Sequence, residues 1–152
     1  DEENLLYHTR AREFFNMLET TGMSKSYKMP ILKAFYNEGS MKMAISDEDV
    51  YRAMKEYYSY GSNGVDMLKD KGTAGYKEWG QKEYVKLAKD NPIKFLKKTE
   101  STFFIEKEGY ALALTDDMVK YIESECFCEH VKDIIELRTL GYYKDRFEKK
   151  EK

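Results

Sequence analysis

The sequence predicts a mainly helical fold with one β-hairpin and an added C-terminal helix. Apolar side chains recur at helical spacing in five parts of the chain, whereas residues 103–114 show the period of two that is typical of strands. A glycine-rich stretch, residues 59–80, interrupts the helices. The order helix, helix, connector, helix, hairpin is that of a winged-helix domain. We therefore expect a winged-helix-like domain over residues 23–114, with an inserted flexible loop at about 59–80.

Two helices are expected before residue 40. Residues 4–20 form an amphipathic pattern that ends before Gly22, so we assign residues 1–22 to an N-terminal helix that docks on the core. Pro30 suits the first turn of a helix because its missing N–H would be unpaired there. A second helix is therefore expected over residues 30–37, ending before Gly39.

The third helix has a clear start signal. Ser46 can cap its N-terminus, and Asp49, three residues further on, can complete a capping box. The helix is expected to reach residue 58. Five glycines among polar residues then make residues 59–80 a long connector, expected to be mobile.

A fourth helix is expected over residues 81–90, ending at Asn91-Pro92, because the residue before a proline is pushed out of the α region. The hairpin that follows should turn at residues 106–109.

The last helix is expected to start at a Thr115 cap and to form a C-terminal extension, residues 115–147, before a charged tail, residues 148–152. Its expected core-facing residues are Val119, Ile122, Cys126, Val131, Ile134 and Ile135.

Composition limits the function classes. The net charge of −2 gives no overall basic excess, but charge is segregated along the chain. Residues 69–98 hold nine lysines and four acidic residues, a net +5, and residues 115–136 hold two lysines and seven acidic residues, a net −5.

No segment resembles a signal peptide or a membrane span, and two cysteines are too few for a disulfide scaffold, so a cytoplasmic protein is expected. A first residue other than Met and a charged end suggest a fragment of a longer protein.

One run of sequence resembles a known family. The run is Lys25-Ser26-Tyr27-Lys28-Met29-Pro30-Ile31-Leu32-Lys33-Ala34-Phe35, with Asn91-Pro92 later leading into an aromatic hairpin. It resembles the C-terminal region of large bacterial superfamily II (DEAD/DEAH-type) helicase or restriction-like proteins, some of which carry a phospholipase D-like nuclease domain. The resemblance covers roughly residues 24–114. It implies a non-catalytic accessory domain on a nucleic-acid motor of restriction or phage defence.

A cationic helix face is the strongest functional feature. On a helix over residues 81–90, Lys82, Lys86 and Lys89 share one face, with apolar side chains opposite them. Lys94, Lys97 and Lys98 follow. Such a surface can neutralise backbone phosphates, although a lysine face is also the ordinary solvated side of an amphipathic helix.

Lys25 and Lys28 are weaker candidates for phosphate binding. They flank Tyr27 near a helix N-terminus, whose N–H groups favour anions. The competing interpretation is that Tyr27 and Met29 pack between helices while both ammonium groups face water.

Three other features give weaker indications of function. Cys126, Cys128 and His130 hint at zinc, but the two thiols point to different sides of a helix, so no metal or cofactor is expected. Trp79 can either stack on bases or fold back to anchor the connector. Lys107 is expected in a solvated turn between two glutamates.

The sequence contains no phosphate-loop, dinucleotide, hydrolase-elbow or zincin pattern, so no enzyme activity is expected of this chain alone. The predicted function is sequence-independent binding of duplex or forked nucleic acid within a larger helicase or restriction-type protein, and the resemblance implies that this nucleic acid is DNA. The alternative is a protein-interaction module whose acidic segment, residues 115–136, docks on the helicase core or a partner protein.

Overall fold

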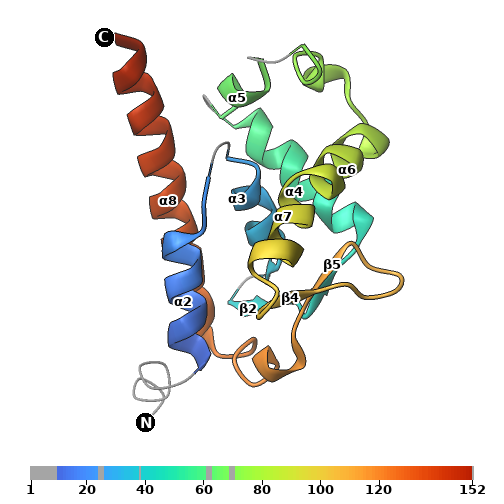
Figure 1. Cartoon of the computed structure of the whole chain (residues 1–152), viewed down its shortest axis with the longest axis vertical. Coiled ribbons are helices and arrows are strands. Elements are labelled where there is room, and N and C mark those ends of the chain that lie inside the picture. Colours follow the sequence, from blue (N-terminus) through green and yellow to red (C-terminus); the bar gives the residue numbers. More distant parts are fainter. Residues whose placement is uncertain (1–9, 24–25, 38, 61–62, 69–70, 152) are drawn as a thin grey trace.

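The computed structural model describes residues 10–23, 26–37, 39–60, 63–68 and 71–151, with the backbone alone from residue 145 onward. The described chain is mainly helical, with small antiparallel sheets (Figure 1). Its helices are α2 (Arg10–Thr20), α3 (Lys28–Ala34), α4 (Asp47–Ser59), α5 (Val65–Leu68), η1 (Tyr76–Glu78), α6 (Gln81–Asp90), α7 (Pro92–Thr99), η2 (Asp116–Met118) and α8 (Glu125–Glu151). Its strands are β1 (Tyr36–Asn37), β2 (Ser40–Met41), β3 (Ala44–Ile45), β4 (Phe104–Ile105) and β5 (Leu112–Leu114).

The start of α4 is the predicted capping box. The N–H of Asp49 donates to Ser46 Oγ at 3.1 Å, and the N–H of Ser46 donates back to Asp49 Oδ2 at 3.0 Å. Lys42 Nζ lies 2.9 Å from Asp49 Oδ1, so the carboxylate is held from two sides. This satisfies backbone donors that a helix start otherwise leaves unpaired.

The prediction for α6 is confirmed at both ends, and the chain turns at Asn91 (φ −124°, ψ −86°) before a new helix, α7, starts at Pro92. Proline fits there because a first-turn residue has no intrahelical N–H bond to lose. Two consecutive helices, α6 and α7, therefore come directly before the hairpin.

The predicted hairpin is confirmed, and it belongs to a larger sheet. Phe104 pairs with Leu114 and Ile105 with Ala113, and Gly109 supplies the positive φ of +84° near the turn. The strand β3 pairs with the other edge of β5, giving the antiparallel order β3-β5-β4. The sequence did not predict β3, because a strand of two residues has no alternation to recognise.

The second helix ends three residues earlier than predicted. It stops at Ala34, and β1 and β2 form a small hairpin whose Gly39 has φ +86°. A glycine there favours this turn as well as a helix stop, so the sequence signal was ambiguous. Residues 4–9 of the predicted first helix lie outside the described residues.

The prediction for the start of the C-terminal helix is wrong. Thr115 precedes a short 3₁₀ turn, and α8 begins at Glu125, where Ser124 Oγ accepts a hydrogen bond from the N–H of Phe127. The N–H of Thr115 is bonded to Phe103 O, which keeps this segment attached to the hairpin. The displaced start changes the buried set: Val119 is 58% exposed and Cys126 is exposed.

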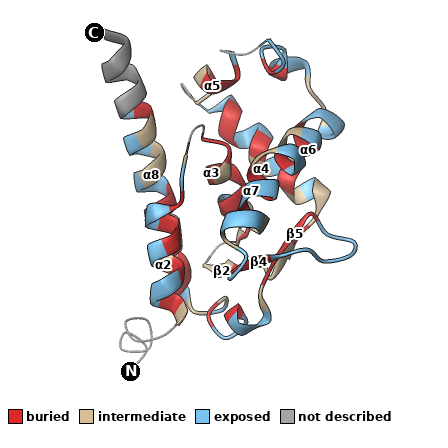
Figure 2. Cartoon of the chain, in the orientation of Figure 1, coloured by how far each residue is buried: buried red, intermediate tan, exposed pale blue. Residues whose placement is uncertain are grey.

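One hydrophobic core joins all parts of the described chain (Figure 2). Phe14 of α2 shows how. Its ring lies 5.1 Å from Phe103, 6.3 Å from Phe104 and 5.7 Å from Phe127, so one side chain joins α2 to the hairpin region and to α8. An edge-to-face aromatic pair stabilises the fold by about 0.5–1.5 kcal/mol beyond the contribution of the apolar area that it buries.

The connector is more ordered than the sequence predicted. It contains α5 and η1, and Met67 and Tyr76 are buried. Gly64 allows a close approach, because a Cβ at this position would lie 2.9 Å from Tyr76 Cζ. Within the described segments, none of the helices has both the length and the apolar composition needed to cross a bilayer.

Candidate functional site

The two faces predicted for α6 are present. Lys82, Lys86 and Lys89 are exposed. The residues that α6 turns inward are Tyr84, Val85 and Ala88. Burial raises the pKa of Tyr84 to about 12, and its ring lies 5.9 Å from Tyr51 of α4. The lysine face is therefore the solvated side of a helix whose other side is fixed to the core.

Carboxylates accompany two of these three lysines. Lys89 Nζ lies 3.1 Å from Asp47 Oδ1, and Lys86 Nζ lies 3.7 Å from Asp90 Oδ2. Lys82 has no such neighbour among the described residues. Because exposed ion pairs contribute about 0–1 kcal/mol, a phosphate can compete for these ammonium groups. The α6 face is weaker as a cationic surface than the sequence suggested.

Helix α7 carries two lysines that have no carboxylate partner among the described residues. Lys94 and Lys98 are exposed one turn apart, and neither forms an ion pair within the part of the chain that the structure describes. Phe95, between them in sequence, is 40% exposed. Lys97 is half-buried, and its Nζ lies 3.9 Å from Glu106 Oε1. Two cations beside a solvent-facing ring are thus presented by the helix that leads into the hairpin.

A groove lies between α6, α7 and the hairpin. Its volume is about 620 Å³. Its lining residues are Lys89, Ile93, Lys97, Glu106, Lys107, Glu108, Gly109, Tyr110 and Ala111. We call it the cationic groove. Three lysines from three separate elements meet there with two glutamates, a net charge of +1.

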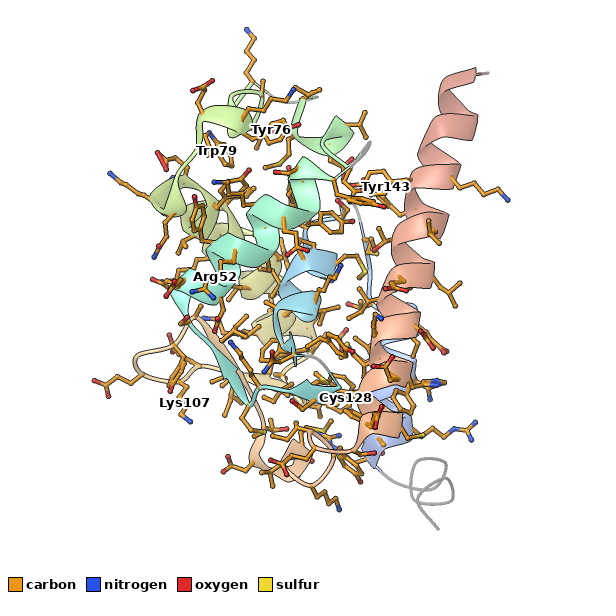
Figure 3. All side chains as sticks on the ribbon, turned by 180° about the vertical axis from the view of Figure 1, so that it is seen from behind. Arg52, Tyr76, Trp79, Lys107, Cys128 and Tyr143 are labelled. Carbon is orange, nitrogen blue, oxygen red and sulfur yellow. The ribbon has the colours of Figure 1, made fainter. Side chains whose placement is uncertain are left out.

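Lys107 is exposed, as predicted for a solvated turn, but its position beside Lys89 and Lys97 depends on the tertiary fold. Figure 3 shows it on the hairpin loop that projects from the body. Its Nζ lies 5.3 Å from the centre of the Tyr110 ring, a cation–π contact that keeps the ammonium group at the surface.

Lys28 does not join this surface. Its Nζ donates to Thr21 Oγ1 at 3.0 Å and to Gly22 O at 2.7 Å, and burial lowers the pKa of the side chain. Tyr27 and Met29 are buried, as the packing interpretation predicts. Lys25 lies outside the described residues.

Ser26 is the centre of a buried polar network. Its Oγ donates to Asp66 Oδ2 at 2.8 Å and lies 3.0 Å from the hydroxyl of Tyr58 and 2.8 Å from that of Tyr143. The N–H of Ser26 also donates to Asp66, and the hydroxyl of Tyr142 donates to the same carboxyl group. Four regions of the chain are tied together at one point.

Burial raises the pKa of Tyr58 and of Tyr143 well above the usual tyrosine value, so both remain hydroxyl donors. A buried polar group must have such partners or lose its hydration without compensation. The K-S-Y-K-M motif, residues 25–29, therefore has a packing role in its described part, and nothing in that part forms an open ligand site.

Cysteine and histidine side chains diverge on α8. Cys126 is exposed, whereas Cys128 is buried and its thiol donates to Ile122 O at 3.2 Å. Burial raises the pKa of Cys128 to about 11. His130 contacts the ring of Phe15 at 4.3 Å. No group of three metal-ligating side chains gathers anywhere among the described residues.

The aromatic residues of the connector differ in exposure. Trp79 is half-buried, with its ring edge-on to Tyr84 at 5.3 Å, and Tyr76 is buried, as expected of rings that fold back. Tyr60 is 77% exposed. Trp79 is therefore an anchor of the connector on α6.

Comparison with known proteins found no matching family model, no matching curated protein and no matching solved structure. The function must be inferred from the chain's own residues.

Proposed function

We propose that the chain is a non-catalytic accessory domain of a larger helicase or restriction-type protein, and that it grips duplex or forked nucleic acid through the backbone phosphates. The observation that carries the proposal is the pair of exposed lysines on α7, Lys94 and Lys98, which form no ion pair among the described residues, with Lys107 on the hairpin loop that follows. Phosphate contacts supply most sequence-independent affinity, so no base preference is expected.

The topology supports a winged-helix interpretation. A strand before α4 and a hairpin after α7 form one antiparallel sheet in the order β3-β5-β4. In a winged-helix domain the helix before the hairpin contacts the duplex, and the hairpin loop reaches the adjacent backbone. Under this interpretation helix α7 and residues 106–109 would take these two roles, and they carry Lys94, Lys98 and Lys107.

The charge balance sets the strength of binding. Lys82, Lys94, Lys98 and Lys107 lack an ion-pair partner among the described residues. If about four lysines contact phosphates, the logarithm of the binding constant should fall with the logarithm of salt concentration with a slope of about −3 to −4. Phe95, being exposed, can stack on an unpaired base at a fork.

Helicase or nuclease chemistry would belong to the rest of the parent polypeptide, in bacterial DNA processing of the restriction or phage-defence kind. A cytoplasmic location fits this role. It also fits two cysteines that form no disulfide, one of them exposed.

Fluorescence anisotropy with labelled duplexes tests the proposal. The wild-type chain should bind several unrelated sequences with equal affinity. Each phosphate contact contributes about 0.9 logarithmic units at 0.1 M salt, so the double variant Lys94→Gln/Lys98→Gln should lose up to about 60-fold in affinity on every sequence.

The matched control is Lys33→Gln, an equal change of charge per site at an exposed residue that lines recesses beside α4 and α8 instead. It should bind within about twofold of wild type. Equal losses in both variants, or no binding by the wild type, would refute the proposal.

Docking to a protein is the second candidate. Segment 115–136 is not one helix, but Glu123, Glu125 and Asp133 are exposed and without an ion-pair partner among the described residues. An acidic surface of this kind suits a basic partner. Absence of nucleic-acid binding together with capture of the helicase core would favour this candidate.

A further inference from the structure

Helix α8 has a solvent-facing stripe that nothing in the described chain covers. Its inner side carries buried residues such as Val131, Ile134 and Ile135. On the outer side, Leu137 and Leu140 are each 69% exposed. Large apolar side chains are rarely left so open in a pair one turn apart, and such a pair is typical of a helix–helix contact.

Two exposed charges extend the pair in both directions. Asp133 precedes Leu137 by four residues, and Lys144 follows Leu140 by four residues. The spacing of four, three and four places all four side chains on one face of a helix, as at the contact positions of a coiled coil. We call Asp133, Leu137, Leu140 and Lys144 the α8 stripe. Neither charge has an ion-pair partner among the described residues.

The α8 stripe is complementary to itself when reversed. If Leu137 of one copy lies against Leu140 of a second copy running antiparallel, the equal spacings place Asp133 of each copy opposite Lys144 of the other. Two leucine contacts are then flanked by two ion pairs. A parallel pair would instead put Asp133 against Asp133 and Lys144 against Lys144, which is repulsive.

We propose that the chain self-associates through the α8 stripe as an antiparallel helix pair with twofold symmetry. Figure 1 shows α8 running along α2 and continuing beyond it, and Tyr142 and Tyr143, which lie outside the α8 stripe, pack toward the body of the chain. All four side chains of the α8 stripe are exposed. A two-fold pair uses one surface patch twice, which is the commonest form of protein association.

The contact is small. The α8 stripe spans about 17 Å at 1.5 Å per residue, so the interface falls in the class of weak, reversible ones. Self-association is independent of the proposed nucleic-acid binding, because it uses a different helix and is measured without nucleic acid.

Sedimentation equilibrium of the chain from about 10 µM to about 1 mM, the range expected of small interfaces, tests the proposal. The average mass should rise from 18.0 kDa toward twice that value. Leu137→Ser should remain at the mass of one chain. Val119→Ser, which truncates an exposed apolar side chain outside the stripe, should associate as wild type does.

Charge exchange tests the antiparallel register. Asp133→Lys alone and Lys144→Glu alone each place like charges opposite one another, so each should stay monomeric. Mixed in equal amounts, the two variants form complementary pairs at both ends, so association should return. The control Lys77→Glu changes charge outside the stripe and should associate as wild type does.

Since the substituted side chains are exposed, circular dichroism should show an unchanged helix content for every variant. A wild-type mass that stays at one chain over the whole range, or single charge variants that associate as well as their mixture, would overturn the proposal.

Discussion

Replacing Ser26 with alanine should strongly destabilise the fold, although the change removes a single oxygen atom. In the native chain Ser26 Oγ donates to Asp66 Oδ2 at 2.8 Å. With its one proton used there, it can accept from the hydroxyl of Tyr58, 3.0 Å away. The substitution removes the first bond and leaves the buried Tyr58 hydroxyl without this partner.

The expected magnitude follows from these two losses. A typical hydrogen bond contributes about 0.5–1.5 kcal/mol, and a buried group left unpaired costs about 1–3 kcal/mol. The free energy of unfolding should therefore fall by about 3 kcal/mol, a large part of the 5–15 kcal/mol that is usual for a domain. Urea denaturation followed by fluorescence of Trp79, the single tryptophan, measures it.

Two comparisons make the result specific. Ser101→Ala removes a hydroxyl from an exposed residue and should change the free energy of unfolding by less than about 0.5 kcal/mol. In a double-mutant cycle, Ser26→Ala combined with Tyr58→Phe should destabilise less than the sum of the single changes, by about 1 kcal/mol. Ser26→Ala within about 0.5 kcal/mol of wild type would refute the reasoning.

Three further outcomes are expected. In the native chain a thiol reagent at pH 8 should modify Cys126 quickly and Cys128 only on unfolding, because Cys128 is buried and its pKa is raised to about 11. Rapid modification of both thiols in the native chain would contradict this. Partial burial tends to raise the pKa of Asp49, but hydrogen bonds from the Ser46 N–H and from Lys42 lower it overall from 3.8. The free energy of unfolding should therefore decrease as pH falls below about 4, and Asp49→Asn should make this decrease smaller in acid titrations. Gly64→Ala should destabilise by about 1–3 kcal/mol because its methyl group would meet Tyr76, and the additional change Tyr76→Phe should recover part of the loss in thermal melts.

Local signals in the sequence were sufficient for several elements. The capping box of Ser46, the bounds of α6 and the hairpin turn before Gly109 each depend on residues within four positions of one another. The solvent-facing position of Lys82, Lys86 and Lys89 followed from periodicity alone. Such features are determined before the chain is folded, so pattern rules find them.

Features that depend on distant residues were missed. The sequence places Asp66 in a polar connector that was expected to be mobile, yet Asp66 is buried. Hydrogen bonds reach it from Ser26, 40 residues earlier, and from Tyr142, 76 residues later. The strand β3 exists because β5 pairs with it, and α8 starts late because Thr115 is bonded to the hairpin region. No local pattern carries this information.

The candidate site shows the same division. Periodicity predicted which lysines face solvent, but not that Asp47 and Glu106 would come from other elements to lie beside Lys89 and Lys97. It also gave no sign that Lys107 would line the same groove. The strongest candidates for phosphate contact are therefore Lys94 and Lys98 of α7 and Lys107 of the hairpin loop, and no longer the lysine face of α6.

The salt dependence of duplex binding by wild type and by Lys94→Gln/Lys98→Gln tests the proposed function most directly. The wild-type chain should show a slope of about −3 to −4 in the logarithm of the binding constant against the logarithm of salt concentration, and the double variant a slope shallower by about 1.8. Slopes that are equal in the two proteins, or close to zero in the wild type, would contradict phosphate binding by α7.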